Sequence, residues 1–244
     1  CSGLQIRVRR FDSGLRLHFT SCSMDPSVLA AMARWPNVPA VYGWLSLTES
    51  GQWRLHPAGD AVQQPEAPGE PITSPQILAF IDRNYEVDSA GQWFFQNGPQ
   101  RVYVRLDAAP YILHTVTDTQ TGRLGLRTHT GLDVSEVKAL YLDSEGRLYV
   151  VTERGGALIA GRDLPVVIDA LQPAQNPSSV RGETRHAPET MDDAIASCLD
   201  SGRTVWVRAP GMRGFAEHGV PLAPVADTQL ESLLEFRRLP RGDA

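Results

Sequence analysis

The chain has 244 residues, of which 42% are hydrophobic and 21% are charged, and its formal net charge is −5. This composition predicts one large or two small folded domains and excludes disordered and collagen-like chains. The most apolar stretch, 155–171, is interrupted by charged residues and a proline, so no transmembrane segment is expected.

The first 23 residues carry four arginines against one aspartate, whereas the rest of the chain is acidic. We interpret residues 1–23 as a disordered or mis-annotated extension of a protein that we expect to be cytoplasmic. The alternative is a lipid anchor at Cys1, as in processed bacterial lipoproteins. Because the rest of the chain has no basic stripe to neutralise phosphates, no nucleic-acid partner is expected.

An ordered domain is expected to begin near Met24 with a helix, because an Asp-Pro pair follows that residue. The next segment, 40–47, is apolar and rich in β-forming residues. A Glu-Ser-Gly turn at 49–51 then separates it from the alternating stretch 52–56. This pattern predicts a β-hairpin.

The same turn signal recurs twice along the chain. Asp-Ser-Ala-Gly at 88–91 precedes the strand-like residues 92–95, and Asp-Ser-Glu-Gly at 143–146 precedes 147–151. We therefore predict three hairpins of one turn design, with glycine at the position where the backbone needs a positive φ.

Two further helices, at 74–85 and 163–171, have a proline at the start and apolar residues at helical spacing. Each follows a hairpin, which indicates a repeated hairpin–helix unit, with a fainter third copy between 200 and 236. This order predicts an α+β fold of antiparallel β-hairpins packed with a few short helices. Three tryptophans are expected to pack against the helices: Trp44, Trp53 and Trp93.

Two proline-rich connections, 57–71 and 173–188, interrupt these elements, and the second is the better domain boundary. The expected organisation is a main α+β domain at 24–172 and a linker at 173–188. A smaller C-terminal α/β segment at 189–244 would pack on or beside the main domain.

The motifs of common enzyme and cofactor sites are missing from the sequence. The six histidines and three cysteines have no metal-ligand spacing, and no serine-nucleophile or glycine-rich phosphate motif occurs. We therefore expect neither a metal nor a cofactor. Cys198 lies on the apolar side of a helix-like segment and is interpreted as buried.

These observations favour a non-catalytic binding or regulatory module over an enzyme. The alternative is an enzyme whose site is assembled on adjacent strands from His114, Arg127, His129 and Asp133. That alternative requires His129 to meet His114 or Asp133 in a concave pocket.

The expected binding surface is a hairpin that combines aromatic, amide and guanidinium groups. Its residues are Trp93, Gln100, Arg101, Tyr103 and Arg105. Because strand side chains alternate, Arg101, Tyr103 and Arg105 are expected on one open face. Such a face suits a small acidic or planar ligand or a protein partner, and a merely solvated strand face is the competing interpretation. The sequence does not indicate an oligomeric state.

Two stretches of the sequence resemble a family of small uncharacterised proteobacterial proteins, a domain of unknown function. They are Arg-Trp-Pro-Asn-Val-Pro-Ala-Val-Tyr-Gly-Trp-Leu-Ser-Leu at 34–47 and Trp-Phe-Phe-Gln-Asn-Gly-Pro-Gln-Arg-Val-Tyr-Val at 93–104. The resemblance covers 24–171 and implies a bacterial, cytoplasmic protein. It supplies no activity and no catalytic residues.

Overall fold

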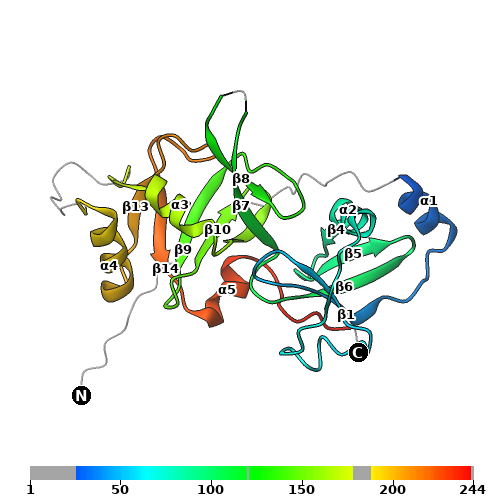
Figure 1. Ribbon diagram of the computed structural model, residues 1–244. Helices are drawn as coiled ribbons and strands as arrows, with labels where there is room; N and C mark the ends of the chain where they lie inside the picture. The colour runs from blue at the N-terminus through cyan, green and yellow to red at the C-terminus, as the bar shows by residue number, and fades with distance from the viewer. Residues whose placement is uncertain (1–25, 120, 178–187, 243–244) are drawn as a thin grey trace, which may run out of the picture.

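The computed structural model describes residues 26–119, 121–177 and 188–242. The extension at 1–23, with the alternative anchor at Cys1, lies outside these residues. The helices of the described part are α1 (Pro26–Arg34), α2 (Pro75–Arg83), α3 (Leu164–Ala170), α4 (Met191–Ser201) and α5 (Asp227–Leu233). The strands form two sheets that lie side by side, and α5 lies between them (Figure 1).

The first sheet contains the strands of the N-terminal half in the order β3-β2-β1-β6-β5-β4. These strands are β1 (Val41–Leu47), β2 (Trp53–Leu55), β3 (Glu70–Pro71), β4 (Tyr85–Val87), β5 (Trp93–Asn97) and β6 (Gln100–Leu106). The hairpin β1–β2 and the meander β4–β5–β6 are antiparallel. A parallel pairing between β1 and β6 joins them into one sheet.

The second sheet has the order β12-β13-β14-β9-β10-β11-β7-β8. Its strands are β7 (Tyr111–Thr117), β8 (Leu124–Thr128), β9 (Val137–Leu142), β10 (Leu148–Thr152), β11 (Gly155–Ile159), β12 (Gln172–Ala174), β13 (Val205–Arg208) and β14 (Val220–Pro224). Antiparallel pairs again dominate, while β11 pairs with β7 and β14 with β9 in parallel.

The α+β class is confirmed, and the sheets are larger and more mixed than a set of hairpins. The helices predicted at 74–85 and 163–171 are α2 and α3. The sequence pattern indicated each hairpin because its two strands are close in the chain. The parallel pairings join strands separated by long connections, and no local pattern encodes which strand edges meet.

The three predicted turns share one backbone conformation. Their glycines have positive φ values of 81° at Gly51, 77° at Gly91 and 79° at Gly146. In two of them an aspartate fixes the turn, because one carboxylate oxygen of Asp88 and one of Asp143 each accepts two backbone N–H groups. This part of the prediction is confirmed.

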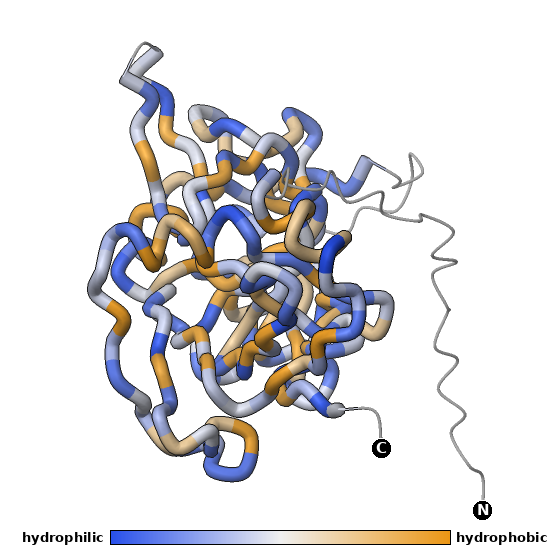
Figure 2. The backbone as a smooth tube through the Cα atoms, turned by 90° about the vertical axis from the view of Figure 1, so that its right-hand side faces the viewer, coloured by the Kyte–Doolittle hydropathy of each residue, from blue (hydrophilic) through white to orange (hydrophobic). Residues whose placement is uncertain are grey.

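The tryptophans divide between core and surface. Trp53 and Trp93 are each 3% exposed, and the Trp53 indole donates a hydrogen bond to Asp82 of α2. The expectation is wrong for Trp44, which is 44% exposed, although the three residues that follow it in β1 are all buried. Figure 2 shows the hydrophobic stretches concentrated in the interior of the molecule.

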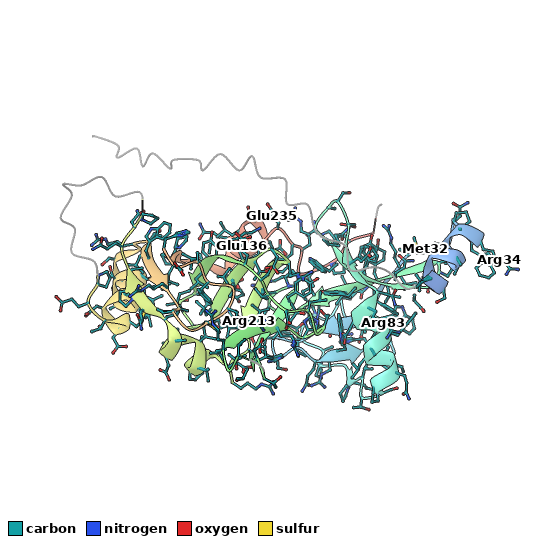
Figure 3. The ribbon with its side chains drawn as sticks, turned by 90° about the horizontal axis from the view of Figure 1, so that it is seen from above. Met32, Arg34, Arg83, Glu136, Arg213 and Glu235 are labelled. Carbon is teal, nitrogen blue, oxygen red and sulfur yellow. The ribbon has the colours of Figure 1, made fainter. Side chains whose placement is uncertain are left out.

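Helix α1 lies at one end of the molecule, and Figure 3 shows Met32 and Arg34 beyond the first sheet. It buries Val28 but leaves Leu29 52% exposed, and Trp35, directly after the helix, is also 52% exposed. Because Val28 is the one buried residue of α1, the helix covers little of the core.

The C-terminal part of the chain contacts both sheets. Strands β12–β14 belong to the second sheet, and the chain then passes through α5 back to the first. There the N–H of Arg237 donates to the carbonyl of Gly91, and the N–H of Leu106 donates to the carbonyl of Arg238, both at 2.9 Å. Residues 178–187 lie outside the described part, and the domain division at 173–188 stays a prediction.

Candidate functional site

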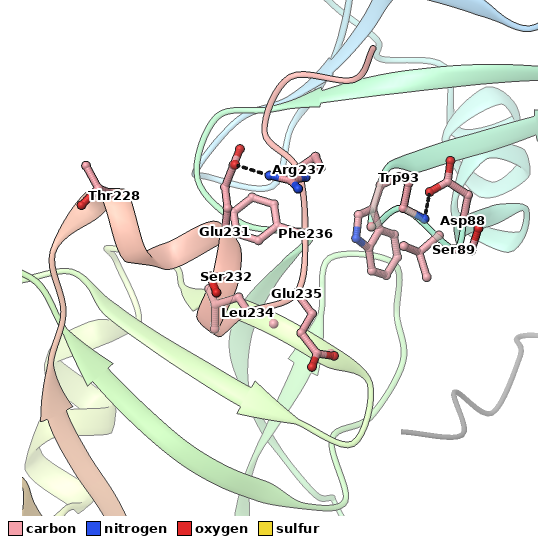
Figure 4. Close-up of a pocket in the computed structure, with 15 residues that line it drawn as sticks. Asp88, Ser89, Trp93, Thr228, Glu231, Ser232, Leu234, Glu235, Phe236 and Arg237 are labelled. Atoms are coloured by element: carbon pink, nitrogen blue, oxygen red, sulfur yellow. Dashed lines mark hydrogen bonds and ion pairs between the residues drawn. The ribbon is translucent and has the colours of Figure 1, made fainter. Parts of the chain in front are cut away.

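A cleft of about 710 Å³ lies between the two sheets. One wall is the β4–β5 turn with Trp93, the opposite wall is the start of β11, and α5 with the segment after it forms the third side (Figure 4). The residues that line the cleft include Ser89, Trp93, Gly156, Glu231, Glu235 and Arg237.

Residues 234–237 cross from the second sheet to the first along this cleft, and two glycines allow the close approach. A Cβ atom on Gly156 would stand 2.5 Å from the Cβ of Leu234. A Cβ atom on Gly91 would stand 3.2 Å from the carbonyl oxygen of Glu235. Close backbone packing at these glycines therefore fixes the crossing segment against both sheets.

Trp93 supplies a buried hydrogen-bond donor without an acceptor. Its side chain is 3% exposed, and its Nε1 has no hydrogen-bond partner. Among the unpartnered buried side-chain atoms of the described residues, it alone belongs to a residue that lines the cleft. An unpaired buried donor costs about 1–3 kcal/mol, which an acceptor placed in the cleft would recover. Figure 4 shows the indole nitrogen on the cleft side of the ring.

Glu235 occupies a backbone conformation that usually belongs to glycine. Its φ is 54°, and among the described residues no other non-glycine residue has a positive φ. The N–H of Phe236 donates to the carbonyl of Glu231 at 3.0 Å, so Glu235 is the left-handed residue that closes the end of α5. A non-glycine residue here costs about 1–2 kcal/mol. Residues in strained conformations cluster at binding sites.

The other carboxylates near the cleft are already occupied. Asp88 accepts two backbone N–H groups and the hydroxyl of Tyr103. Glu231 accepts the N–H of Arg238 at 2.8 Å and pairs with the guanidinium of Arg237 at 3.4 Å. The carboxylate of Glu235 has no hydrogen bond or ion pair with any described residue, and it is exposed. Glu235 is therefore the carboxylate that remains available to a ligand.

The predicted binding residues do not form one surface. Trp93 lines the cleft, and Tyr103 reaches it indirectly through Asp88. Gln100 donates to the carbonyl of Pro39 instead. Arg101 is exposed, and its guanidinium lies over the ring of Phe94 with 4.5 Å to the ring centroid.

The expected open face of β6 is wrong for two of its three residues. Tyr103 is 5% exposed and Arg105 is 4% exposed. The guanidinium of Arg105 donates to three carbonyls of the segment 57–69 and to the carboxylate of Asp107. Strand alternation predicted one open face, but the segment 57–69 covers Arg105, and the ring of Tyr103 is stacked on that of Tyr42 with 4.7 Å between the centroids.

The four residues of the enzyme hypothesis lie in three separate arrangements. Arg127 and Asp133 form an exposed ion pair at 2.7 Å. His114 pairs with Asp163 at 2.9 Å. Burial opposes ionisation of Asp163, but hydrogen bonds from Thr115 and His114 outweigh it and lower the pKa of this carboxyl to about 2.

His129 is half-buried as a residue, and its ring packs against Trp53, Tyr85 and Tyr111 rather than lining the cleft. Its Nδ1 accepts the N–H of Ile112 at 3.2 Å, and its Nε2 has no partner. Burial, with a smaller effect of His114, lowers the pKa of His129 to about 3, so the ring is neutral. No hydrogen bond joins His129 to His114 or Asp133. The arrangement does not favour the enzyme alternative.

Three further kinds of site concern the described part of the chain, namely a metal site, a membrane span and a reactive thiol. In this part, no three His, Cys, Asp or Glu side chains come together to hold a metal ion. No helix there is long and apolar enough to span a membrane. The predicted burial of Cys198 is confirmed, since it is 0% exposed and burial raises the pKa of its thiol to about 11.

A family model, DUF2944, matches residues 24–240, and its description is "Protein of unknown function (DUF2946)". The chain belongs to this family. The match confirms the resemblance noted from the sequence. It also extends the DUF2944 region past residue 171, through β12–β14 and α5, so that both sides of the cleft lie within it.

Two solved structures are similar to this DUF2944 protein, and both are DUF1285 family proteins. The protein from Silicibacter pomeroyi DSS-3 has 18% identity and a TM-score of 0.40, covering 64% of this chain and 81% of its own. The protein from Shewanella baltica OS155 has 13% identity and a TM-score of 0.36, covering 52% and 91%. At these TM-scores the likeness carries no argument about the site. No curated protein matches the chain.

Sequence reasoning missed Glu235. The signal that marks a left-handed helix end is a glycine, and Leu234, Glu235 and Phe236 stand directly after residues 227–233 instead. Trp93 was found because an aromatic residue beside a turn is visible in the sequence, whereas its position between two sheets depends on long-range pairing.

Proposed function

We propose that this protein is a non-catalytic binding or regulatory module that holds a small ligand in the cleft between its two sheets. The observation that carries the proposal is the buried, unpartnered Nε1 of Trp93 in the cleft wall. The volume of about 710 Å³ falls within the range of small-molecule sites.

The composition of the walls supports a regulatory consequence of binding. A ligand in the cleft would touch Ser89 from the first sheet, Gly156 from the second and Glu235 from the crossing segment. Such a ligand stabilises the arrangement of the two sheets that it binds most tightly. The difference between its affinities for two arrangements sets how far the equilibrium between them shifts. Because a ligand that binds in the cleft also stabilises one arrangement of the sheets, the binding role and the regulatory role form one hypothesis.

The test uses two hairpin turns as a matched pair. Ser89 and Ser144 are exposed residues that directly follow the aspartate in turns with the same backbone bonds, but only Ser89 lines the cleft. Ser89→Tyr should therefore fill the cleft, while Ser144→Tyr places the same side chain on a remote turn. Both variants keep the aspartate and the glycine that the turn needs.

The measurement is a ¹H–¹⁵N spectrum of the indole N–H groups, with the Trp93 signal assigned from Trp93→Phe. A fragment library with equal numbers of cationic, anionic and neutral compounds is added. We expect compounds that shift the Trp93 signal in the wild type and in Ser144→Tyr but not in Ser89→Tyr. A library in which no charge class shifts this signal, or hits that bind Ser89→Tyr equally well, would contradict the proposal.

A further inference from the structure

We infer that the ligand of this cleft is a small cationic amine that also carries an oxygen acceptor, as amino-acid amides and amino alcohols do. The inference rests on the proposed function and names the chemical class of the ligand. It follows from two unsatisfied groups of opposite hydrogen-bonding character, the carboxylate of Glu235 and the indole N–H of Trp93.

The charge of the cleft favours a cation. Its lining contains the carboxylates of Asp88, Glu231 and Glu235 against one guanidinium, that of Arg237. Arg237 is 61% exposed and already pairs with Glu231 at 3.4 Å, so it offers little to an anion. Glu235 is unpaired, and an ammonium group beside it would form a charge-assisted hydrogen bond.

The backbone at Glu235 is an independent sign that its side chain matters. Glycine or asparagine would close the end of α5 with less strain than a glutamate with a φ of 54°. The carboxylate has no partner among the described residues that would explain its place at this position. A ligand that binds the carboxylate gives the residue a function that compensates for the strain.

The second requirement is an oxygen acceptor. Trp93 Nε1–H is a donor only, and its ring is packed against Tyr85 and Tyr111, with centroids 4.8 and 5.1 Å away. The indole is thus held in place by core residues, and the acceptor must come to it. An ammonium group cannot satisfy this donor, so the ligand needs a carbonyl or hydroxyl oxygen in addition to its nitrogen.

Four probes that share one isobutyl group separate these requirements. Leucinamide has both groups, N-acetyl-leucinamide keeps the acceptor without the charge, isoamylamine keeps the charge without the acceptor, and N-acetyl-leucine is an anion. The Trp93 indole signal is followed during titration of each probe. We expect leucinamide to bind at least about tenfold more tightly than any of the other three, as expected for one good polar contact.

A matched pair of variants assigns the charge preference. Glu235→Gln should lower the affinity for leucinamide about tenfold and make it equal to that for N-acetyl-leucinamide. Glu66→Gln removes the same charge from an exposed residue outside the cleft and should leave both affinities unchanged.

Equal or tighter binding of N-acetyl-leucinamide, isoamylamine or N-acetyl-leucine would overturn the inference. So would an unchanged affinity for leucinamide in Glu235→Gln. If the fragment library gives hits at Trp93 but none of the four probes binds, the cleft is a binding site for another class of ligand, and the inference alone is wrong. If the library also gives no hits, the proposed function fails together with the inference.

Discussion

Two hairpin turns of this protein make the same local bonds and differ in their surroundings. One oxygen of Asp88 and one of Asp143 accept two turn N–H groups each, at 2.8–2.9 Å. The second oxygen of Asp143 accepts from the guanidinium of Arg147, and that of Asp88 accepts from the hydroxyl of Tyr103. The Asp88 turn lines the cleft, and the Asp143 turn does not.

The local bonds of each turn contribute to folding, whereas the position of the turn in the molecule decides whether it takes part in the proposed function. Around Asp143 both carboxylate oxygens are used within the protein, and the unpartnered hydroxyl of the neighbouring Tyr149 lies outside the cleft. Around Asp88 the turn itself is equally satisfied, but the neighbouring Trp93 and Glu235 have unused hydrogen-bonding groups. On the proposed function, the ligand therefore binds residues left unsatisfied beside a rigid turn and not the turn itself.

The largest effect on stability is expected at Arg105, where every guanidinium nitrogen donates a hydrogen bond within the protein. Arg105→Ala leaves three carbonyls and Asp107 without their donor and should lower the free energy of unfolding by about 3 kcal/mol or more. Arg101→Ala, on the same strand but exposed, should cost less than about 1 kcal/mol. Urea denaturation of both variants measures the difference, and equal losses would show that the burial of Arg105 is not what holds the segment 57–69.

Both turns should lose stability when their aspartates are replaced. Asp88→Ala and Asp143→Ala each remove the acceptor of two backbone N–H groups and should each lower the free energy of unfolding by about 2 kcal/mol. Chemical denaturation measures the stability, and the Trp93 indole signal measures leucinamide binding. Binding should weaken in Asp88→Ala alone. A loss of binding in Asp143→Ala as well would show that general stability, and not the cleft, controls it.

His129 also has a ring nitrogen without a partner, but this residue lies outside the cleft. It should therefore affect the stability of the protein and not the binding of a ligand. Its pKa is about 3 in the folded protein and 6.5 when unperturbed, so the unfolded chain takes up the proton first as the pH falls. The free energy of unfolding should therefore decrease below pH 6.5, by about 2 kcal/mol at pH 5.

The lowered pKa of His56 acts in the same direction as that of His129, so a variant must separate the two. Denaturation between pH 5 and 7 should show a smaller slope in His129→Asn than in the wild type. An unchanged slope would mean that His129 is not buried as a neutral ring.

The smallest expected effect is a gain in stability. Glu235→Gly removes the strain of a left-handed glutamate and should raise the free energy of unfolding by up to about 1 kcal/mol, while the affinity for leucinamide falls about tenfold, as in Glu235→Gln. Thermal unfolding measures the gain. A loss of stability would show that the side chain of Glu235 has structural contacts, and would remove the argument that it is kept for binding.

The sequence predicted the local elements better than the site. The Asp-Ser-x-Gly turns and the helices α2 and α3 follow from residues close together in the chain, and they were found. The exposed face expected for Arg105 was wrong because the distant segment 57–69 covers it. The cleft could not be predicted, since it joins Trp93, Gly156 and Glu235 from three parts of the chain.

A crystal structure of the protein with leucinamide tests the central claim most directly, because it shows both proposed contacts at once. We predict the molecule in the cleft, with its carbonyl oxygen about 2.7–3.2 Å from the Nε1 of Trp93 and its ammonium nitrogen at a similar distance from the carboxylate of Glu235. A cleft without the molecule at saturating leucinamide, or a molecule bound there without either contact, would contradict the account.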